Sequence, residues 1–440
     1  MRPSAKSLSK NTSLFPLGLI VLTVGLCCNP TQSNEKSTDI DRYFSALATN
    51  NQAPEVYDVK IRENGITEFY LDGEDYLGKP TRFFALYRPS SNSISLPSGK
   101  SPAIVLVHGG GGTAFEEWLE KWNNIGFAAM SIAVEGQTDT LIVGKTKQYW
   151  QRHAYSGPAR VGIYEDAHKP IKEQWMYHAV SAVIRARNFL ESTPQIDSDH
   201  IGLSGISWGG IITSTVIGFD PGFDFAIPVY GCGFLNTIDN QYKRALSDND
   251  VYRKVWEPAN RIAKFTNPSL WLTWRDDQHF ALDAQASTYH QVGGDFAVSI
   301  KPEMEHNHPK GWNQSESYLF AKYIVSHGTP WVKSISTKMI NQNSAQAEFQ
   351  FDLNIENYKV VDTSIHYSTK LGHTHEGDWV QAPTQINLLA GSNNTYIATH
   401  HQLPNDVTRW FINLKVDVSL PHEGTINTYL VSSHFINNRR

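Results

Sequence analysis

The chain has 440 residues, of which 40% are hydrophobic and 18% charged, and its formal net charge is −5. This composition is typical of a globular chain that is long enough for a large core and a second domain. The charged residues form no basic face and no long charge run, so nucleic acid is not an expected partner.

The first 28 residues have the pattern of an export signal. Basic residues come first, and residues 14–26 form an apolar run that is too short for a comfortable membrane span. Cys27 and Cys28 follow, as in bacterial lipoprotein signals with an acylated cysteine, although Leu26 stands where such signals have a small residue. We therefore expect an exported protein, in the periplasm, anchored to the outer membrane or extracellular. A lipid anchor, the one membrane contact expected, and free secretion both stay open.

Residues 29–52 are polar and predict a flexible tether, and a catalytic domain is expected over residues 53–328. Residues 65–71 and 81–87 alternate in polarity, which predicts two antiparallel strands. Residues 103–107 are continuously apolar, as in a central strand of a parallel sheet that is covered on both faces.

A predicted strand-to-helix turn at Ser207 organises this domain. Gly205-Ile206-Ser207-Trp208-Gly209 fits the G-x-S-x-G nucleophile elbow, with a short apolar run before it and a buried helix expected over 210–218. A serine attacks an acyl carbon only if its hydroxyl is exposed near a base, and a sharp turn supplies that exposure. The turn strains and crowds the backbone, and the flanking glycines relieve the crowding. Ser207 is the candidate nucleophile; a bystander serine in a glycine-rich turn is the alternative.

Strands and helices are expected to alternate around this turn. The further strands are 127–133, 225–230, 269–274 and 296–300, and the further helices are 116–124, 172–190, 282–291 and 316–326. A long polar loop over 134–171 should overhang the ends of the strands, and a helical insert covers 236–265. The alternation predicts an α/β fold with a mainly parallel sheet flanked by helices.

The pattern changes after Gly328. Segments of period two appear without helices and are separated by turn signals, at residues 347–351, 363–367, 394–398 and 408–413. They predict that residues 329–440 form a small all-β sandwich of immunoglobulin or fibronectin type, an accessory domain whose role the sequence does not specify.

A serine hydrolase also needs an acid and a base, which should follow buried strands beyond the nucleophile. Asp276 and Asp277 both follow the strand at 269–274, and we favour Asp277 because the apolar Phe280 three residues later can pack the turn. His306 and His308 both follow the strand at 296–300. We favour His306 as the base, and the alternative is that His306 packs the loop while His308 reaches the serine.

The oxyanion formed during acyl transfer requires main-chain N–H donors. One donor is expected from Trp208, directly after the nucleophile, and a second from Gly110 or Gly111 in the glycine run after His108. No phosphate-binding lysine motif accompanies this run, so no cofactor is expected. No H-E-x-x-H motif occurs either, and the mature chain offers only Cys232, so neither a metal site nor a disulfide framework is expected.

These residues resemble the α/β-hydrolase superfamily, most closely the branch with acetyl xylan esterases, dienelactone hydrolases and the catalytic domains of prolyl oligopeptidases. The resemblance covers about residues 55–328. It rests on the glycine run from His108, the elbow at Ser207, the turn at Asp277 and the segment Met304-Glu305-His306-Asn307-His308. It implies Ser207 as nucleophile, Asp277 as acid, His306 as base, and Trp208 with the glycine loop as oxyanion donors.

The leading functional hypothesis is a secreted or lipid-anchored serine carboxylesterase that removes acyl groups, chiefly acetyl, from a polysaccharide or oligosaccharide. One alternative is a peptidase that resembles prolyl oligopeptidases, although about 100 residues before Ala103 leave no room for their large β-propeller. The other alternative is a carbohydrate-binding protein without activity. One fold hosts esterases, peptidases and lactonases, so the sequence does not fix the substrate.

Overall fold

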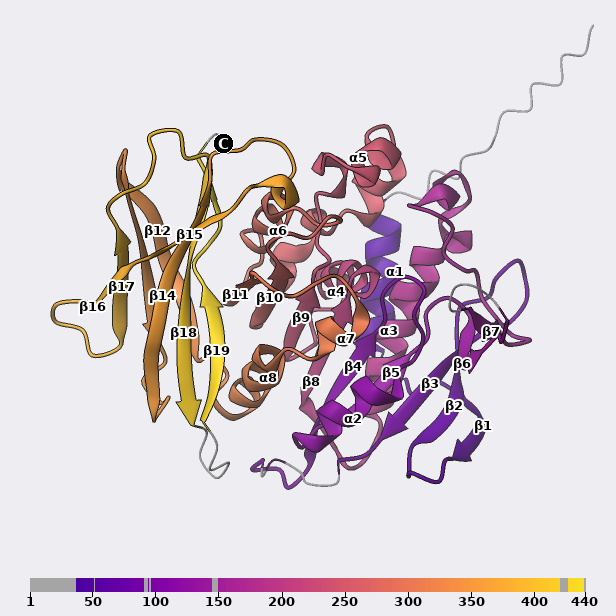
Figure 1. The fold of residues 1–440 in the computed structure, drawn as a ribbon. Coiled ribbons are helices and arrows are strands. Elements are labelled where there is room, and N and C mark those ends of the chain that lie inside the picture. The colour runs from indigo at the N-terminus through magenta and orange to yellow at the C-terminus, as the bar shows by residue number, and fades with distance from the viewer. Residues whose placement is uncertain are drawn as a thin grey trace, which may run out of the picture. The chain divides into compact units, whose positions relative to one another are not determined.

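A 14-stranded mixed sheet links the two halves of the chain (Figure 1). The computed structural model describes residues 37–50, 52–90, 94, 96–144, 149–419 and 426–438. The expected export signal of residues 1–28 and the first part of the expected tether lie outside these ranges. Among the described helices, none has the length and the apolar character needed to cross a membrane.

The large sheet has its strands in an order that differs from the chain order. From one edge to the other, its strands are β1 (Val56–Ile61), β2 (Thr67–Asp72), β3 (Arg82–Arg88), β5 (Ala128–Ile132), β4 (Ser101–Val107), β8 (Ile196–Ile206), β9 (Phe225–Val229), β10 (Ser269–Trp274), β11 (Phe296–Lys301), β19 (Ile426–Ser432), β18 (Arg409–Ser419), β14 (Tyr358–Ser368) and β15 (Val380–Pro383), with β20 (Ile436–Asn437) beside β18. The strands from β5 to β11 are parallel to one another. The expected α/β sheet is therefore present.

Two smaller sheets and a set of helices complete the described fold. A four-stranded sheet has the order β12 (Val332–Asn341), β13 (Ser344–Phe351), β17 (Thr395–His400) and β16 (Gln385–Leu388), and β6 (Gln137–Leu141) pairs with β7 (Trp150–Arg152). The α-helices are α1 (Ser37–Thr49), α2 (Glu116–Asn124), α3 (Trp175–Glu191), α4 (Trp208–Phe219), α5 (Gln241–Leu246), α6 (Leu282–Tyr289), α7 (His308–Trp312) and α8 (Ser315–His327). Short 3₁₀ or π turns lie at Glu165–His168, Ile171–Glu173, Leu235–Thr237, Tyr252–Trp256, Pro258–Asn260, Ile262–Lys264 and Thr374–Glu376.

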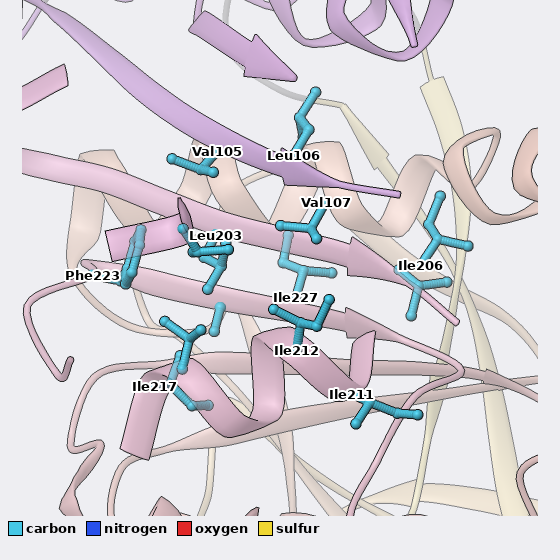
Figure 2. Packing of buried hydrophobic residues seen from close by; sticks show 14 of the residues in the cluster. Val105, Leu106, Val107, Leu203, Ile206, Ile211, Ile212, Ile217, Phe223 and Ile227 are labelled. Carbon is cyan, nitrogen blue, oxygen red and sulfur yellow. The ribbon is translucent and has the colours of Figure 1, made fainter. Parts of the chain in front are cut away.

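Strands β4, β8 and β9 form the centre of the core. Their apolar side chains are buried, and Figure 2 shows Val107, Leu203 and Ile227 of the three strands close to Ile212 of α4. Continuous apolar runs suit these strands because helices cover both faces of a parallel sheet. Helices α1, α3 and α4 pack together on one face, and α2 packs with α8 on the other (Figure 1).

Helix α1 differs from the flexible tether expected over residues 29–52. The chain is helical from Ser37 to Thr49 because Ile40, Phe44 and Ala48 recur every four residues and form one buried apolar stripe. The Phe44 ring lies 5.2 Å from the ring of Tyr177 in α3 and 4.9 Å from that of Phe219 in α4. The polar residues that precede Ser37 led to the expectation of a tether, although the helical spacing of Ile40, Phe44 and Ala48 was present in the sequence.

The C-terminal strands form two antiparallel sheets that pack as a β-sandwich. One sheet is the group β12, β13, β17 and β16, and the other is the end of the large sheet from β19 to β15. Their shared core includes Phe349 of β13 and Ile412 and Val416 of β18, all buried. Helix α8 ends at His327 with Gly328 in the left-handed conformation at φ +76°, where the sequence predicts the change from helices to strands.

The sandwich continues the hydrolase sheet because β19 pairs antiparallel with β11. The buried Glu316 carboxylate of α8 stabilises this junction by accepting hydrogen bonds from the Leu430 backbone N–H at 2.9 Å and from the Lys301 ammonium at 2.5 Å. Each of these three residues comes from a different element, so one side chain ties α8, β11 and β19 together.

We expect Glu316→Ala to lower the free energy of unfolding by about 3 kcal/mol, because it leaves a largely buried Lys301 without its partner. Urea unfolding followed by fluorescence measures the change. The control is Asp239→Ala, which removes a pair with Lys243 whose side chains are 74% and 53% exposed. This control should cost less than about 1 kcal/mol. Equal losses in the two variants would contradict a stabilising role for the junction.

Candidate active site

Ser207 stands at the sharp turn between β8 and α4. Its backbone has φ +59° and ψ −114°, a strained conformation for a residue with a side chain, and its N–H donates a 2.8 Å hydrogen bond to the Val229 carbonyl. A Cβ at Gly205 would lie 2.1 Å from the Gly209 carbonyl oxygen, and one at Gly209 would lie 2.0 Å from the Val107 carbonyl oxygen. Both positions therefore require glycine, as the elbow pattern predicts.

His306 lies beside this serine, in the loop after β11. Its Nε2 is 2.9 Å from Ser207 Oγ. The imidazole packs between two aromatic rings, with its centroid 4.4 Å from that of Tyr230 and 5.8 Å from that of Phe280. Tyr230 is itself held by a 2.6 Å hydrogen bond from its hydroxyl to the Glu305 carbonyl. This packing restricts rotation of the imidazole and keeps Nε2 directed at the serine.

Asp277 completes a hydrogen-bonded chain that runs from Ser207 through His306. Its Oδ2 lies 2.6 Å from His306 Nδ1, and its Oδ1 accepts hydrogen bonds from the N–H groups of His279 at 2.7 Å and Phe280 at 3.1 Å. The carboxylate is fully buried, so these bonds replace its hydration. The neighbouring Asp276 instead forms an ion pair with Arg275 at 2.7 Å. Of the two candidate acids, the structure brings Asp277 to the histidine.

His308, the alternative base, contacts the glycine loop and not the serine. Its Nε2 accepts a 2.9 Å hydrogen bond from the Gly109 N–H, and its ring centroid lies 4.8 Å from that of Phe115. The two histidines therefore have different partners. His306 contacts Ser207, whereas His308 binds the backbone of the glycine loop.

The glycine loop lies against the start of α4. The Gly112 N–H donates to the Gly109 carbonyl at 3.0 Å, which closes a tight turn. A Cβ at Gly110 would lie 3.0 Å from Trp208 Cδ1, so this part of the loop packs against the Trp208 side chain. Trp208 is the first residue of α4, where an N–H has no acceptor within its own helix. Gly111, at φ +73°, borders open space, and its carbonyl accepts a 2.9 Å hydrogen bond from Trp150 Nε1.

The buried His108 fixes the other end of this loop. Its Nε2 accepts a 3.1 Å hydrogen bond from the Val134 N–H, and its Nδ1 lies 2.7 Å from the Gly109 carbonyl. Burial lowers the pKa of His108 to about 3, so the ring stays neutral and can accept this bond.

Residues from the C-terminal strands also reach the turn that carries Asp277. The Leu282 N–H donates a 3.0 Å hydrogen bond to Thr374 Oγ1, which lies between β14 and β15. Arg275 Nη1 lies 3.4 Å from Nδ1 of His366 in β14. Neither contact was predicted from the sequence, because nothing in the local pattern links residues about 90 positions apart.

Two further residues beside the site were not predicted from the sequence. Tyr230 is the first residue after β9, a position at the same edge of the sheet as Ser207, and this position was the available signal. Arg160 lies in the loop expected to overhang the strand ends, and its guanidinium Cζ is 4.7 Å from the Trp208 ring centroid. No pattern in the loop distinguishes this arginine from the neighbouring Arg152.

Across residues 37–438, outside the gaps given above, no group of three or more His, Cys, Asp or Glu side chains is arranged to hold a metal ion. Cys232 is buried and free.

Residues 88–270 match the family model described as acetyl xylan esterase. The matched segment is less than half of the chain. It includes the glycine loop and Ser207, whereas Asp277 and His306 lie beyond it. No curated protein matches the chain.

Several solved structures are similar to part of this chain. The acetyl xylan esterase from Paenibacillus sp. R4 is 18% identical, with 62% of this chain and 91% of that chain covered and a TM-score of 0.45. Acetyl xylan esterase 1 from Thermoanaerobacterium sp. JW/SL YS485 is 17% identical, with 65% and 93% covered and a TM-score of 0.48. The acylaminoacyl peptidase from Pyrococcus horikoshii is 15% identical, with 63% and 50% covered and a TM-score of 0.41.

The parallel sheet, the elbow and the helices on both faces define the α/β-hydrolase fold. The match to the acetyl xylan esterase family adds the chemical class, so the protein is a carboxylic ester hydrolase of this fold. The resemblance inferred from the sequence is thereby confirmed at the level of fold and enzyme class.

The buried position of His308 predicts how the stability of the protein depends on pH. Burial lowers the pKa of His308 to about 4, and the nearby His306 acts in the same direction. Between this value and about 6.5, the usual pKa of histidine, the unfolded chain binds a proton that the folded chain does not. Stability from this group is therefore present above pH 6.5 and is lost as the pH falls toward 4.

We expect the wild type to lose about 1–2 kcal/mol more unfolding free energy between pH 7.5 and 5.0 than His308→Gln. Glutamine does not titrate, and its side-chain oxygen can still accept the Gly109 N–H. Urea unfolding of both proteins at the two pH values measures the difference. The same pH dependence in both would mean that His308 is not held neutral by the fold.

Proposed function

We propose that the protein is an exported serine carboxylesterase that removes acyl groups, chiefly acetyl, from a polysaccharide or oligosaccharide. The observation that carries the proposal is the row of contacts from Ser207 Oγ to His306 Nε2, at 2.9 Å, and from His306 Nδ1 to Asp277 Oδ2, at 2.6 Å. This is the arrangement that activates a serine hydroxyl for attack on an acyl carbon.

The proposed reaction begins with attack of Ser207 Oγ on the ester carbonyl carbon, while His306 Nε2 takes the hydroxyl proton. The carbonyl oxygen becomes an oxyanion, for which the N–H groups of Gly110 and Trp208 are the proposed donors. Collapse of the tetrahedral intermediate breaks the ester bond, and His306 gives its proton to the leaving alcohol. The product of this step is an acyl-enzyme on Ser207.

In the second half of the reaction, His306 takes a proton from water, which attacks the acyl carbon and releases the carboxylic acid. His306 then returns the proton to Ser207. Asp277 accepts the Nδ1–H bond in every step, which fixes the tautomer of the imidazole and stabilises its protonated form. Its burial strengthens this effect, since water does not compete for the carboxylate.

Two observations support the carbohydrate substrate and the location. The family whose model matches residues 88–270 is described as acetyl xylan esterase, and acetylated xylan is a polysaccharide ester. The basic and apolar start of the chain supports export, by free secretion or with a lipid anchor at Cys27 or Cys28.

The first test is hydrolysis of p-nitrophenyl acetate by the chain without its export signal. We expect Ser207→Ala to lower kcat/KM by at least about 10⁴-fold, because the acyl-enzyme cannot form. Absorbance of released p-nitrophenol measures the rate, and circular dichroism checks the fold of the variant. Equal turnover in the two proteins would exclude Ser207 as the nucleophile. Hydrolysis of acetylated xylan, followed as released acetate, is the next measurement.

The neighbouring residues Asp277 and Asp276 provide a matched pair of variants that tests which of them is the catalytic acid. We expect Asp277→Asn to lower kcat by about 10⁴-fold, because an amide disfavours the required imidazole tautomer. Asp276→Asn should change kcat by less than about threefold, since Asp276 pairs with Arg275 and does not contact His306. Steady-state kinetics on p-nitrophenyl acetate compares the two. A larger loss for Asp276→Asn would reverse the assignment of the acid.

A further inference from the structure

Arg160 borders the predicted oxyanion hole. Its guanidinium stacks over the Trp208 ring, with Cζ 4.7 Å from the ring centroid. Its Nη2 lies 2.9 Å from the position that a Cβ on Gly110 would occupy. Trp208 and Gly110 are the two proposed oxyanion donors, so a fixed cation lies next to both of them.

The guanidinium is held firmly but has donor capacity left. Nε donates to Glu135 Oε1 at 3.2 Å, and Nη1 donates to the Gly162 carbonyl at 2.7 Å. Nη2 donates to no group in the described part of the chain. The side chain is 20% exposed, so it is neither a free surface arginine nor a sealed structural one. The two bonds orient the group, and Nη2 is left for a ligand.

The local charge balance favours an anion. The Glu135 carboxylate pairs with Arg160, and Arg152 donates from Nη1 to the backbone carbonyl of the same residue. Counted over Arg152, Arg160 and the Glu135 carboxylate, the net charge is +1. Burial raises the pKa of the Glu135 carboxyl, and both arginines oppose this shift.

A second unpaired donor lies on the same aromatic cluster. Tyr164, four residues after Arg160, packs with its ring centroid 5.7 Å from that of Trp208. Its side chain is 5% exposed, and its hydroxyl has no hydrogen-bond partner among the described residues. Because this hydroxyl is buried, Tyr164 supports the Trp208 ring from inside the cluster, and the partly exposed Arg160 is the group that a ligand can reach.

A simple acetyl ester does not use these groups. Its carbonyl oxygen is accommodated by the N–H donors, and its methyl group offers no acceptor for a guanidinium. A carboxylate, in contrast, matches the donors of an arginine in both charge and geometry.

We propose that Arg160 binds a carboxylate of the substrate, so that the preferred ester is anionic close to its acyl carbon. This inference rests on the proposed esterase function and specifies its substrate class. The carboxylate has two chemical sources, which are a dicarboxylic acyl group and an acidic sugar on the alcohol side of the ester. In both cases Arg160 acts in specificity, and the Ser207 chemistry is unchanged.

Two matched pairs of esters distinguish the sources. Mono-4-nitrophenyl succinate and 4-nitrophenyl butyrate differ by a carboxylate on the acyl side. The second pair, 4-acetoxybenzoate and 4-acetoxybenzamide, differs by a carboxylate on the alcohol side. Measurement of kcat/KM at pH 7.5 for all four esters gives a ratio of charged to neutral substrate for each side. We expect a ratio above one for one of the two pairs in the wild type.

Arg160→Gln should lower that ratio by about 10- to 100-fold, the effect of losing one charge-assisted hydrogen bond. Arg160→Lys keeps the charge without the planar fork and should retain part of the ratio. Arg152→Gln is the matched control, because it removes an equal charge close to the Glu135 carboxylate, whereas Arg160 is the arginine that stacks on Trp208. If Arg152→Gln lowered the ratio of charged to neutral kcat/KM by the same factor, the effect would come from the general electrostatic field. That result would overturn a direct contact of Arg160 with the carboxylate.

The wild type alone also decides the question if Arg160→Gln does not fold. Raising NaCl from 50 to 500 mM should increase KM for the charged ester and leave KM for its neutral partner unchanged. Hydrolysis of the neutral esters with no preference for a charged one would overturn the carboxylate site and leave the esterase standing. Failure to hydrolyse any of the four esters would overturn the esterase function and this inference with it.

Discussion

The hydrogen-bonded chain of Ser207, His306 and Asp277 depends on the parallel register of the central sheet. Strands β8, β10 and β11 all point their carboxyl ends to one edge, and Ser207, Asp277 and His306 follow these ends after one, three and five residues. Such short connections leave each side chain little freedom to go elsewhere. The contacts of 2.9 Å and 2.6 Å are therefore set by the sheet, and any slip in register would separate the three residues.

The surroundings of each side chain separate the roles of two like pairs, Asp276 with Asp277 and His306 with His308. Asp277 is fully buried and is bound by a histidine and two backbone N–H groups, whereas Asp276, its neighbour in the chain, is a partner of Arg275. His306 and His308 divide in the same way between the serine and the glycine loop. In each pair, one residue faces the reacting centre and the other stabilises the structure around it.

The C-terminal strands are physically coupled to the site. Strand β19 extends the hydrolase sheet beside β11, and Thr374 accepts the Leu282 N–H at the end of the turn that carries Asp277. Loss of order in these strands would therefore reach the acid through two routes, the sheet edge and the turn. The β-sandwich is therefore tied to both the strand that precedes His306 and the turn that carries Asp277.

The sequence by itself determined the local features. A continuous apolar run predicted β4, the glycines around Ser207 predicted the elbow, and Phe280 favoured Asp277, because each depends on neighbours within a few residues. Tertiary structure decided the rest. Helix α1 buries its apolar stripe against α3 and α4, which lie far along the chain. His306 and His308 took different roles through partners about 100 and 200 residues away. Strand β19 joined a sheet that begins far earlier in the chain. Arg160 acquired its place beside Trp208 in the same way. The physical reason is that hydrogen-bond partners between distant segments follow from strand register and side-chain packing, which no local periodicity encodes.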